Sequence, residues 1–259
     1  MAQHISARPS HPLWGAEIRA QRAAIHIRSL DRHLKRWSQV MQDKTGWEVD
    51  ASGHSRPTSV DDDLPMDVLG RSGIWIGEAV YSLRSALDYL VYNIACVCNN
   101  EHHVADTQFP ICDHWDDFIA QATGRHPRTG KRKVCRLRHV PKEVIARIGQ
   151  LQPGADPPCE WTRQLRDLSN LDKHRSMASV RSEANLMRSD HPELTGLVPD
   201  ARNGQEYYFV VGVYFKDTHD DVVDTLKLLH SHVRALIEEF KPAFQTTAHV
   251  VKIEDPGGA

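Results

Sequence analysis

Titratable and amide side chains crowd into one short stretch of the sequence, LSNLDKHRSM, at residues 168–177. His174 is the only side chain in it whose ordinary pKa suits proton transfer near neutral pH. Asp172 could orient the imidazole, and Lys173 and Arg175 could stabilise a developing anion. In the last turn of a helix, the same basic residue types would instead satisfy free carbonyl groups and the helix dipole. The stretch is therefore an acid–base site, a binding site or a helix end.

A second group of polar side chains falls in residues 64–98. Arg84 and Asp88 are four residues apart, so they can pair along the surface of a helix. A half-buried guanidinium beside a carboxylate is suited to holding an anion, because it bonds a carboxylate or phosphate in a two-pronged way. An ordinary salt bridge is the structural alternative. The polar side of this helix is expected to hold Glu78, Tyr81, Ser82, Arg84, Ser85, Asp88, Tyr89 and Tyr92.

Residues 125–139 form a basic segment, within the sequence GRHPRTGKRKVCRLRH. A phosphate backbone could follow such a segment. No aromatic residue is interleaved, so base stacking is not indicated. The glycines and the proline favour instead a mobile, solvated loop.

Metal sites are weakly indicated. Six cysteines and histidines lie close together in the sequence, but their spacing differs from that of structural zinc sites. They are Cys96, Cys98, His102, His103, Cys112 and His114. A di-metal site in a helical bundle normally needs Glu-x-x-His pairs, which the sequence lacks; Glu78, Asp88 and His174 would be an incomplete ligand set. We expect no metal and no cofactor.

The composition is that of an ordinary globular protein, with 40% hydrophobic and 25% charged residues among 259. The net charge of −2 creates no overall field for nucleic acid or membrane, so any such affinity must come from a local patch. The five cysteines are an odd number in a chain that does not need disulfides. The first twenty residues hold no apolar run of signal-peptide length, and no stretch approaches the roughly 20 apolar residues that span a bilayer. We expect a cytoplasmic protein with reduced thiols.

Apolar residues at steps of three and four predict the elements that position these groups. Helices are expected over residues 12–43, 64–98, 159–174 and 219–240, and Pro242 is expected to end the last. On residues 64–98 the buried stripe should be Ile76, Val80, Leu83, Leu87, Leu90 and Ile94. On residues 159–174 one face should carry Arg163, Asp167, Asn170 and His174. Aromatic and β-branched residues predict a strand over residues 206–217.

These elements predict a mainly α fold, a helical bundle with a small antiparallel β-sheet (α+β). The sheet should combine residues 45–50, 176–186 and 206–216. We expect a single domain of residues 1–259, with residues 124–139 as its basic loop.

Four stretches, in this order and spacing, carry a resemblance: GEAVYSLRSALDYLVYNIA, TQFPIC, IGQLQPG and LRDLSNLDKHRSM. Together they resemble a widespread group of uncharacterised bacterial proteins with LRSALDxLVY and LDKHR motifs. The LRSALDYLVY helix is also similar to helices of HEPN-type domains, helical bundles that often act as RNases in bacterial defence and toxin systems. Those enzymes use an Arg and a His four to six residues apart, usually across a dimer interface. Here the nearest approach is Arg166 to His174, with seven residues between them, which departs from that spacing. The resemblance implies a helical scaffold, and with it RNA as the expected substrate and a possible homodimer.

The leading hypothesis is a HEPN-like helical protein with an Arg/Asp/His acid–base site that cleaves RNA or another phosphate-containing substrate. His174 would be the acid–base group, and Asp172 or Asp88 would orient it. Arg84 and Arg175 would hold the anion. The full set of expected substrate-binding residues is Arg84, Arg175, Lys173, Asn170, Glu78, Tyr81, Tyr92 and Trp161.

Two alternatives remain. The first is a small-molecule enzyme of hydrolase or lyase type, with a pocket between residues 64–98 and 159–174. Its aromatic lining would be Tyr81, Tyr89, Tyr92 and Trp161. The second is a non-enzymatic interaction protein in which both polar clusters are structural ties.

Overall fold

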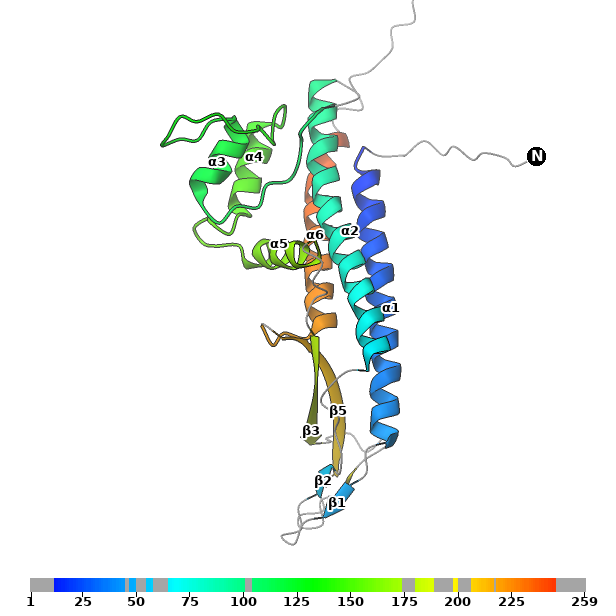
Figure 1. Cartoon of the computed structure of the whole chain (residues 1–259). Helices are drawn as coiled ribbons and strands as arrows, with labels where there is room; N and C mark the ends of the chain where they lie inside the picture. Colours follow the sequence, from blue (N-terminus) through cyan, green and yellow to red (C-terminus); the bar gives the residue numbers. More distant parts are fainter. Residues whose placement is uncertain are drawn as a thin grey trace, which may run out of the picture. The chain divides into compact units, whose positions relative to one another are not determined.

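Helices make up most of the structure, a computed structural model shown in Figure 1. It describes residues 12–44, 47–49, 55–57, 65–100, 104–173, 180–188, 198–199, 206–216 and 218–245. The mainly α class predicted from the sequence is confirmed. No helix in these ranges has both the length and the apolar character that a membrane span requires.

Three long helices form where the apolar periodicity predicts them. They are α1 (Trp14–Lys44), α2 (Met66–Asn99) and α6 (Val222–Gln245). The predicted stripe on α2 is buried at every position from Ile76 to Ile94. The predicted end at Pro242 is wrong, because α6 continues through it to Gln245. Proline removes one N–H and crowds the carbonyl four residues earlier, and this close to the helix end that cost does not stop the final turn.

The chain forms two compact units, and the boundary between them falls within the three long helices and within the helix Glu160–Lys173. The first unit takes residues 1–23, 80–170 and 229–259, and the second takes residues 24–79 and 171–228. The single-domain organisation stays a prediction.

The first unit adds three short helices to parts of the long ones. They are α3 (Trp115–Thr123), α4 (Lys142–Gln150) and α5 (Glu160–Lys173). Helices α3 and α4 lie side by side (Figure 1). Their contact is close at Gly149, where a Cβ would lie 3.0 Å from Trp115 and 3.1 Å from Phe118 and would push these rings by a few tenths of an ångström. Large apolar side chains from every segment are fully buried, including Leu87, Phe109, Phe118, Leu137, Ile148 and Leu165.

In the second unit α1 and α2 also pack together, with the His33 and Trp75 rings edge to face at 4.9 Å. Its strands are β1 (Trp47–Val49), β2 (Ser55–Pro57), β3 (Val180–Arg188), β4 (Val198–Pro199) and β5 (Glu206–Phe215). Strand β5 pairs antiparallel with β3 and with β4. The expectation that residues 45–50 join those strands is wrong within the described residues, because β1 pairs with β2. The connection between β1 and β2 is only a few residues long, so closing it costs little chain entropy.

Candidate functional site

The predicted pairing of Arg84 with Asp88 is confirmed, with Arg84 Nη2 3.2 Å from Asp88 Oδ1. Both side chains also bind the backbone of one distant residue. Asp88 Oδ1 accepts the N–H of Phe109 at 2.9 Å, and Arg84 Nη2 donates to the Phe109 carbonyl oxygen. Burial lowers the pKa of the Arg84 guanidinium, and the neighbouring Asp88 carboxylate opposes that shift. Because the nitrogen that reaches Asp88 is also committed to Phe109, the pair ties α2 to the segment that follows it.

Gln152 holds the same segment from the end of α4. Its side chain is fully buried, and its Oε1 accepts the N–H of Cys112 at 2.9 Å. Its Nε2 donates to the carbonyl oxygens of Pro110 and Ile148, both at 2.9 Å. These three hydrogen bonds offset the free-energy cost of removing the Gln152 amide from water. The backbone of residues 109–112, FPIC, is therefore held by Arg84 and Asp88 of α2 and by Gln152. We call these contacts the FPIC clamp.

Asp113 extends the clamp to α5. Its Oδ2 lies 2.6 Å from Arg166 Nη1, and this hydrogen bond holds the pKa of the Asp113 carboxyl below its ordinary value. The N–H of Gly154 donates to the Cys112 carbonyl at 3.2 Å. A Cβ at Gly154 would lie 2.5 Å from the Asp113 carbonyl oxygen, so only glycine fits. Three of the stretches that carry the sequence resemblance thus meet around one loop.

The motif stretch, residues 168–177, begins in the last turns of α5. His174 and Arg175 fall outside the described residues, so their meeting with Arg84 and Asp88 stays a prediction. Asp172 and Lys173 belong to the end of α5, in a part of that helix where only the backbone is described. Asn170 is exposed on α5.

The other predicted site residues contact different neighbours. Glu78 Oε2 lies 3.8 Å from Nε2 of His26, and Tyr81 is 55% exposed. Tyr92 lies near Tyr89, with ring centroids 6.4 Å apart. Trp161 stacks on the ring of His232 at 5.3 Å.

The ring of Tyr89 packs against α1. A Cβ on Gly15 would lie 2.9 Å from it, and the Arg19 guanidinium lies 3.9 Å from its centroid. The described contacts therefore do not gather Tyr89 and Trp161 into one aromatic pocket.

The basic segment consists of turns and irregular, mostly exposed backbone with one short bridge, and its predicted mobility stays a prediction. It leaves α3 at Gly124, which has a positive φ of 78°, and an antiparallel bridge joins Arg125 to Arg132. The N–H of His126 donates to the Lys131 carbonyl at 2.9 Å, inside this bridge. We call residues 124–132 the basic hairpin. Pro127, Thr129 and Gly130 lie in its turn, so the sequence does contain a local signal for this hairpin.

The hairpin and the chain after it are anchored to the rest of the first unit. The N–H of Arg136 donates to the Gln121 carbonyl at 2.7 Å, and its own carbonyl accepts the N–H of Gln108 at 3.2 Å. The Cys135 thiol donates to the Ala122 carbonyl at 3.2 Å. At the hairpin tip Arg128 pairs with Asp116 of α3. These contacts fix the backbone that presents the basic side chains.

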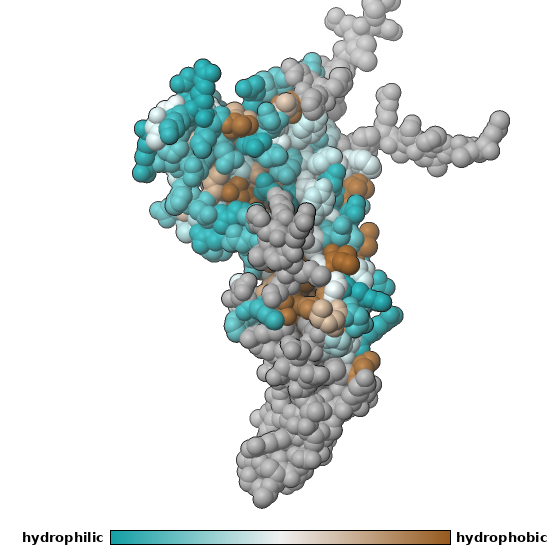
Figure 2. Space-filling view, viewed as in Figure 1, coloured by the Kyte–Doolittle hydropathy of each residue, from teal (hydrophilic) through white to brown (hydrophobic). Residues whose placement is uncertain are grey.

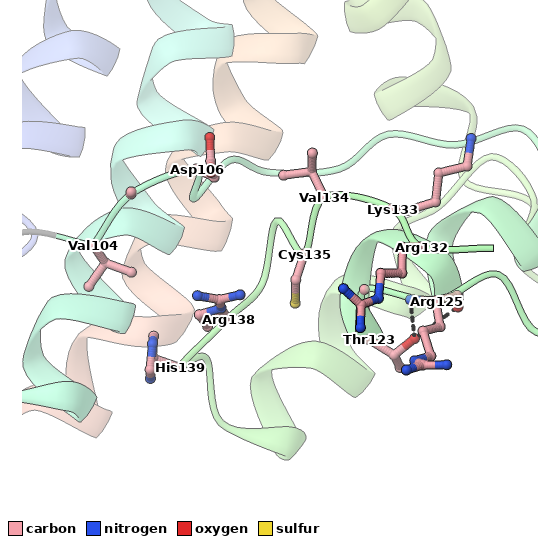
Figure 3. Close-up of a pocket in the computed structure, with 12 residues that line it drawn as sticks. Val104, Asp106, Thr123, Arg125, Arg132, Lys133, Val134, Cys135, Arg138 and His139 are labelled. Atoms are coloured by element: carbon pink, nitrogen blue, oxygen red, sulfur yellow. Dashed lines mark hydrogen bonds between the residues drawn. The ribbon is translucent and has the colours of Figure 1, made fainter. Parts of the chain in front are cut away.

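A pocket of about 750 Å³ opens between the hairpin, the chain up to His139 and residues 104–106. Its charged lining consists of Asp106, Arg125, Arg132, Lys133 and Arg138. Figure 3 shows Arg138 and Arg132 on opposite sides of Cys135, with all three among the pocket-lining side chains. In Figure 2 the surface over α3 and α4 is mainly hydrophilic.

The pocket is suited to binding an anion. Four exposed cationic side chains face one carboxylate, and among the described residues none of the four is held by an ion pair. Its volume falls in the range of about 300–1,000 Å³ that is usual for ligand sites. Sequence reasoning found the excess of positive charge but missed the opposite wall at Val104–Asp106.

Metal ligation has no candidate in the part of the chain that the structure describes, where no three His, Cys, Asp or Glu side chains cluster. The Cys112 thiol, which the sequence placed near a possible zinc set, is buried against Gln121 Nε2 at 3.1 Å. Burial raises the pKa of this thiol to about 11. Comparisons with protein families, with curated proteins and with solved structures find no match to this chain.

Proposed function

We propose that this chain is a cytoplasmic helical protein that binds RNA, or another phosphate-containing ligand, in the basic pocket. The observation that carries the proposal is the set of four exposed cations around one open cavity, with a single carboxylate among them. The net charge of the whole chain is −2, so this local excess is set against an otherwise balanced molecule.

The chemistry of the lining favours phosphate over other anions. Three of the four cations are arginines, whose planar guanidinium bonds phosphate oxygens in a two-pronged way. The lining contains no Phe, Tyr or Trp, and the His139 imidazole is its single aromatic ring, so it offers little platform on which successive bases could stack. Binding is therefore expected to follow the phosphate groups, to be independent of base sequence and to weaken with salt.

The test is a binding titration with a fluorescein-labelled oligouridine, followed by fluorescence anisotropy at several salt concentrations. The double variant Arg132→Gln/Arg138→Gln removes two pocket cations and should weaken binding by about tenfold or more. The slope of log K against log salt should also fall by about 1.4, since each lost contact to a single strand contributes about 0.7.

A matched control is Lys227→Gln/Arg234→Gln, which removes the same charge from exposed positions on α6. This control should bind like the unsubstituted protein. Equal losses in the two double variants would mean that net charge, and not the pocket, governs binding, and would remove the pocket from the proposal.

Cleavage of the bound RNA is the further part of this proposal, with His174 as the acid–base group and Arg175 beside it. It is supported by the residue types of LSNLDKHRSM and by the resemblance to HEPN-type domains, which also suggests a homodimer. His174→Ala should abolish cleavage while leaving binding in the pocket intact. Unchanged cleavage by a folded variant would remove His174 from the mechanism.

Of the two alternatives, the structural-tie hypothesis has an observation in its favour, since Arg84 and Asp88 hold the backbone of Phe109. It applies to that pair and is compatible with binding in the pocket. Among the residues that the structure describes, no contact gathers the four predicted aromatic side chains into the pocket of a small-molecule enzyme.

The small antiparallel sheet belongs to the proposal as well. The register that places Val180 opposite Phe215 and Arg188 opposite Tyr207 supports it. Slow exchange at the alternate amides that face the partner strand would be the matching observation, and fast exchange at every amide of both strands would contradict it.

A further inference from the structure

We infer that Arg84 and Asp88 are positioning residues for the basic pocket, although neither lines it. They hold Phe109, and through Phe109 they set the separation of the two pocket walls. The inference rests on the proposed function, because it assigns a role in ligand binding at that same site.

The first link is the three-point attachment of Phe109. Its N–H is held by Asp88 Oδ1 at 2.9 Å, its carbonyl oxygen by Arg84 Nη2, and its ring is fully buried. A residue fixed at its donor, its acceptor and its side chain has little freedom to shift against α2. The two charged groups are themselves paired at 3.2 Å, so a shift of either one away from Phe109 also disturbs their ion pair.

The second link runs from Phe109 to the pocket through its chain neighbour. The N–H of Gln108 donates to the Arg136 carbonyl at 3.2 Å, and the N–H of Arg136 donates to the Gln121 carbonyl at 2.7 Å. Arg136 directly follows Cys135 and lies two residues before Arg138, both of which line the pocket. One wall is thus bonded to the residue next to Phe109.

The third link is the opposite wall. Val104, Ala105 and Asp106 line the pocket and lead without interruption into Gln108 and Phe109. Figure 3 shows Val104 and Asp106 near Arg138 and His139 at the same end of the pocket. Both pocket walls are therefore connected to the backbone that Arg84 and Asp88 hold. Movement of Phe109 would change the distance between the two walls.

Because the attachment of Phe109 depends on an ion pair, single substitutions in that pair are expected to change ligand affinity. Asp88→Asn keeps an oxygen that can accept the Phe109 N–H, but it removes the charge that offsets the buried Arg84. The Arg84 guanidinium and the backbone at Phe109 are then expected to shift. The cationic side chains of the pocket would no longer be aligned with the bound ligand. Substitutions along such a path typically change affinity by about 2- to 30-fold.

Isothermal titration with oligouridine measures both the dissociation constant and the number of competent sites. Asp88→Asn should raise the dissociation constant about tenfold with the stoichiometry unchanged. A merely structural role would lower the stoichiometry, through loss of folded protein, and leave the dissociation constant as it was. That outcome, or an unchanged dissociation constant in a folded variant, would overturn the inference.

Two further variants keep the test decisive if Asp88→Asn does not fold. Gln108→Pro removes the N–H that reaches Arg136 without touching a charge, and it should weaken binding more than Gln108→Ala, which keeps that N–H. Arg147→Gln loses a two-pronged ion pair with Glu239 in the same unit, away from the pocket, and should bind normally. Equal affinities for Gln108→Pro and Gln108→Ala would overturn the inference. Absence of binding by the unsubstituted protein would instead refute the proposed function and, with it, this role.

Discussion

Replacing Gln152 by alanine should destabilise the fold more than any other single change to a polar side chain in the FPIC clamp. The Gln152 side chain is fully buried and serves three backbone groups, all at 2.9 Å. Two of them would lose this partner outright, the N–H of Cys112 and the carbonyl of Pro110. The third, the Ile148 carbonyl, keeps the N–H of Leu151 at 3.1 Å.

The magnitude follows from the two groups left unpaired. A buried donor or acceptor without a partner costs about 1–3 kcal/mol, so the pair accounts for about 2–6 kcal/mol. The cavity left by truncation adds to this, because the surrounding core relaxes only in part. A loss of roughly 3–6 kcal/mol is a large part of the 5–15 kcal/mol that is typical for the stability of a folded protein.

Urea unfolding followed by circular dichroism measures the effect. Gln152→Met keeps most of the volume but neither hydrogen-bonding function, so it should recover the cavity contribution and still lose about 2 kcal/mol or more. Gln150→Ala is the matched control, since Gln150 is exposed two residues earlier and, among the described residues, its side chain bonds only Arg147, at 3.2 Å. Its effect should be within about 0.5 kcal/mol. The clamp would be refuted if Gln152→Ala and Gln150→Ala unfolded at the same urea concentration.

Three further predictions concern the same unit and its neighbour. Gly154→Ala should lower the urea concentration at the unfolding midpoint sharply, because its Cβ would lie 2.5 Å from the Asp113 carbonyl oxygen. Gly70 in α2 has open space around it, so Gly70→Ala should be neutral or stabilising by up to about 1 kcal/mol in the same assay. The lowered pKa of Asp113 beside Arg166 gives stability that is present above the ordinary carboxyl pKa and is lost as the pH falls through the lower folded value. Asp113→Asn should therefore reduce the loss of stability measured between about pH 5 and 2. An unchanged pH dependence in this variant would contradict the prediction. The Cys112 thiol, buried and with its pKa raised to about 11, should resist iodoacetamide at pH 8 until the protein unfolds, and mass spectrometry showing rapid labelling of the folded protein would be the contrary result.

Several features were determined by the sequence itself because they depend on local spacing. The apolar repeat from Ile76 to Ile94 predicted a long helix and its buried face, and both are found. The four-residue step from Arg84 to Asp88 predicted their ion pair, since that spacing brings side chains together on any helix. The excess of positive charge in the basic segment was likewise predicted from its amino-acid composition.

Other features were decided only by the tertiary structure. The partner of Arg84 and Asp88 is the backbone of Phe109, more than twenty residues away, and Gln152 reaches Cys112 across forty. Backbone N–H and C=O groups are the same at every residue, so no pattern of side chains marks which of them a distant amide or guanidinium will bind. The basic segment became a pocket wall for the same reason: its turn is encoded locally, but residues 104–106 face it only because the clamp holds them there.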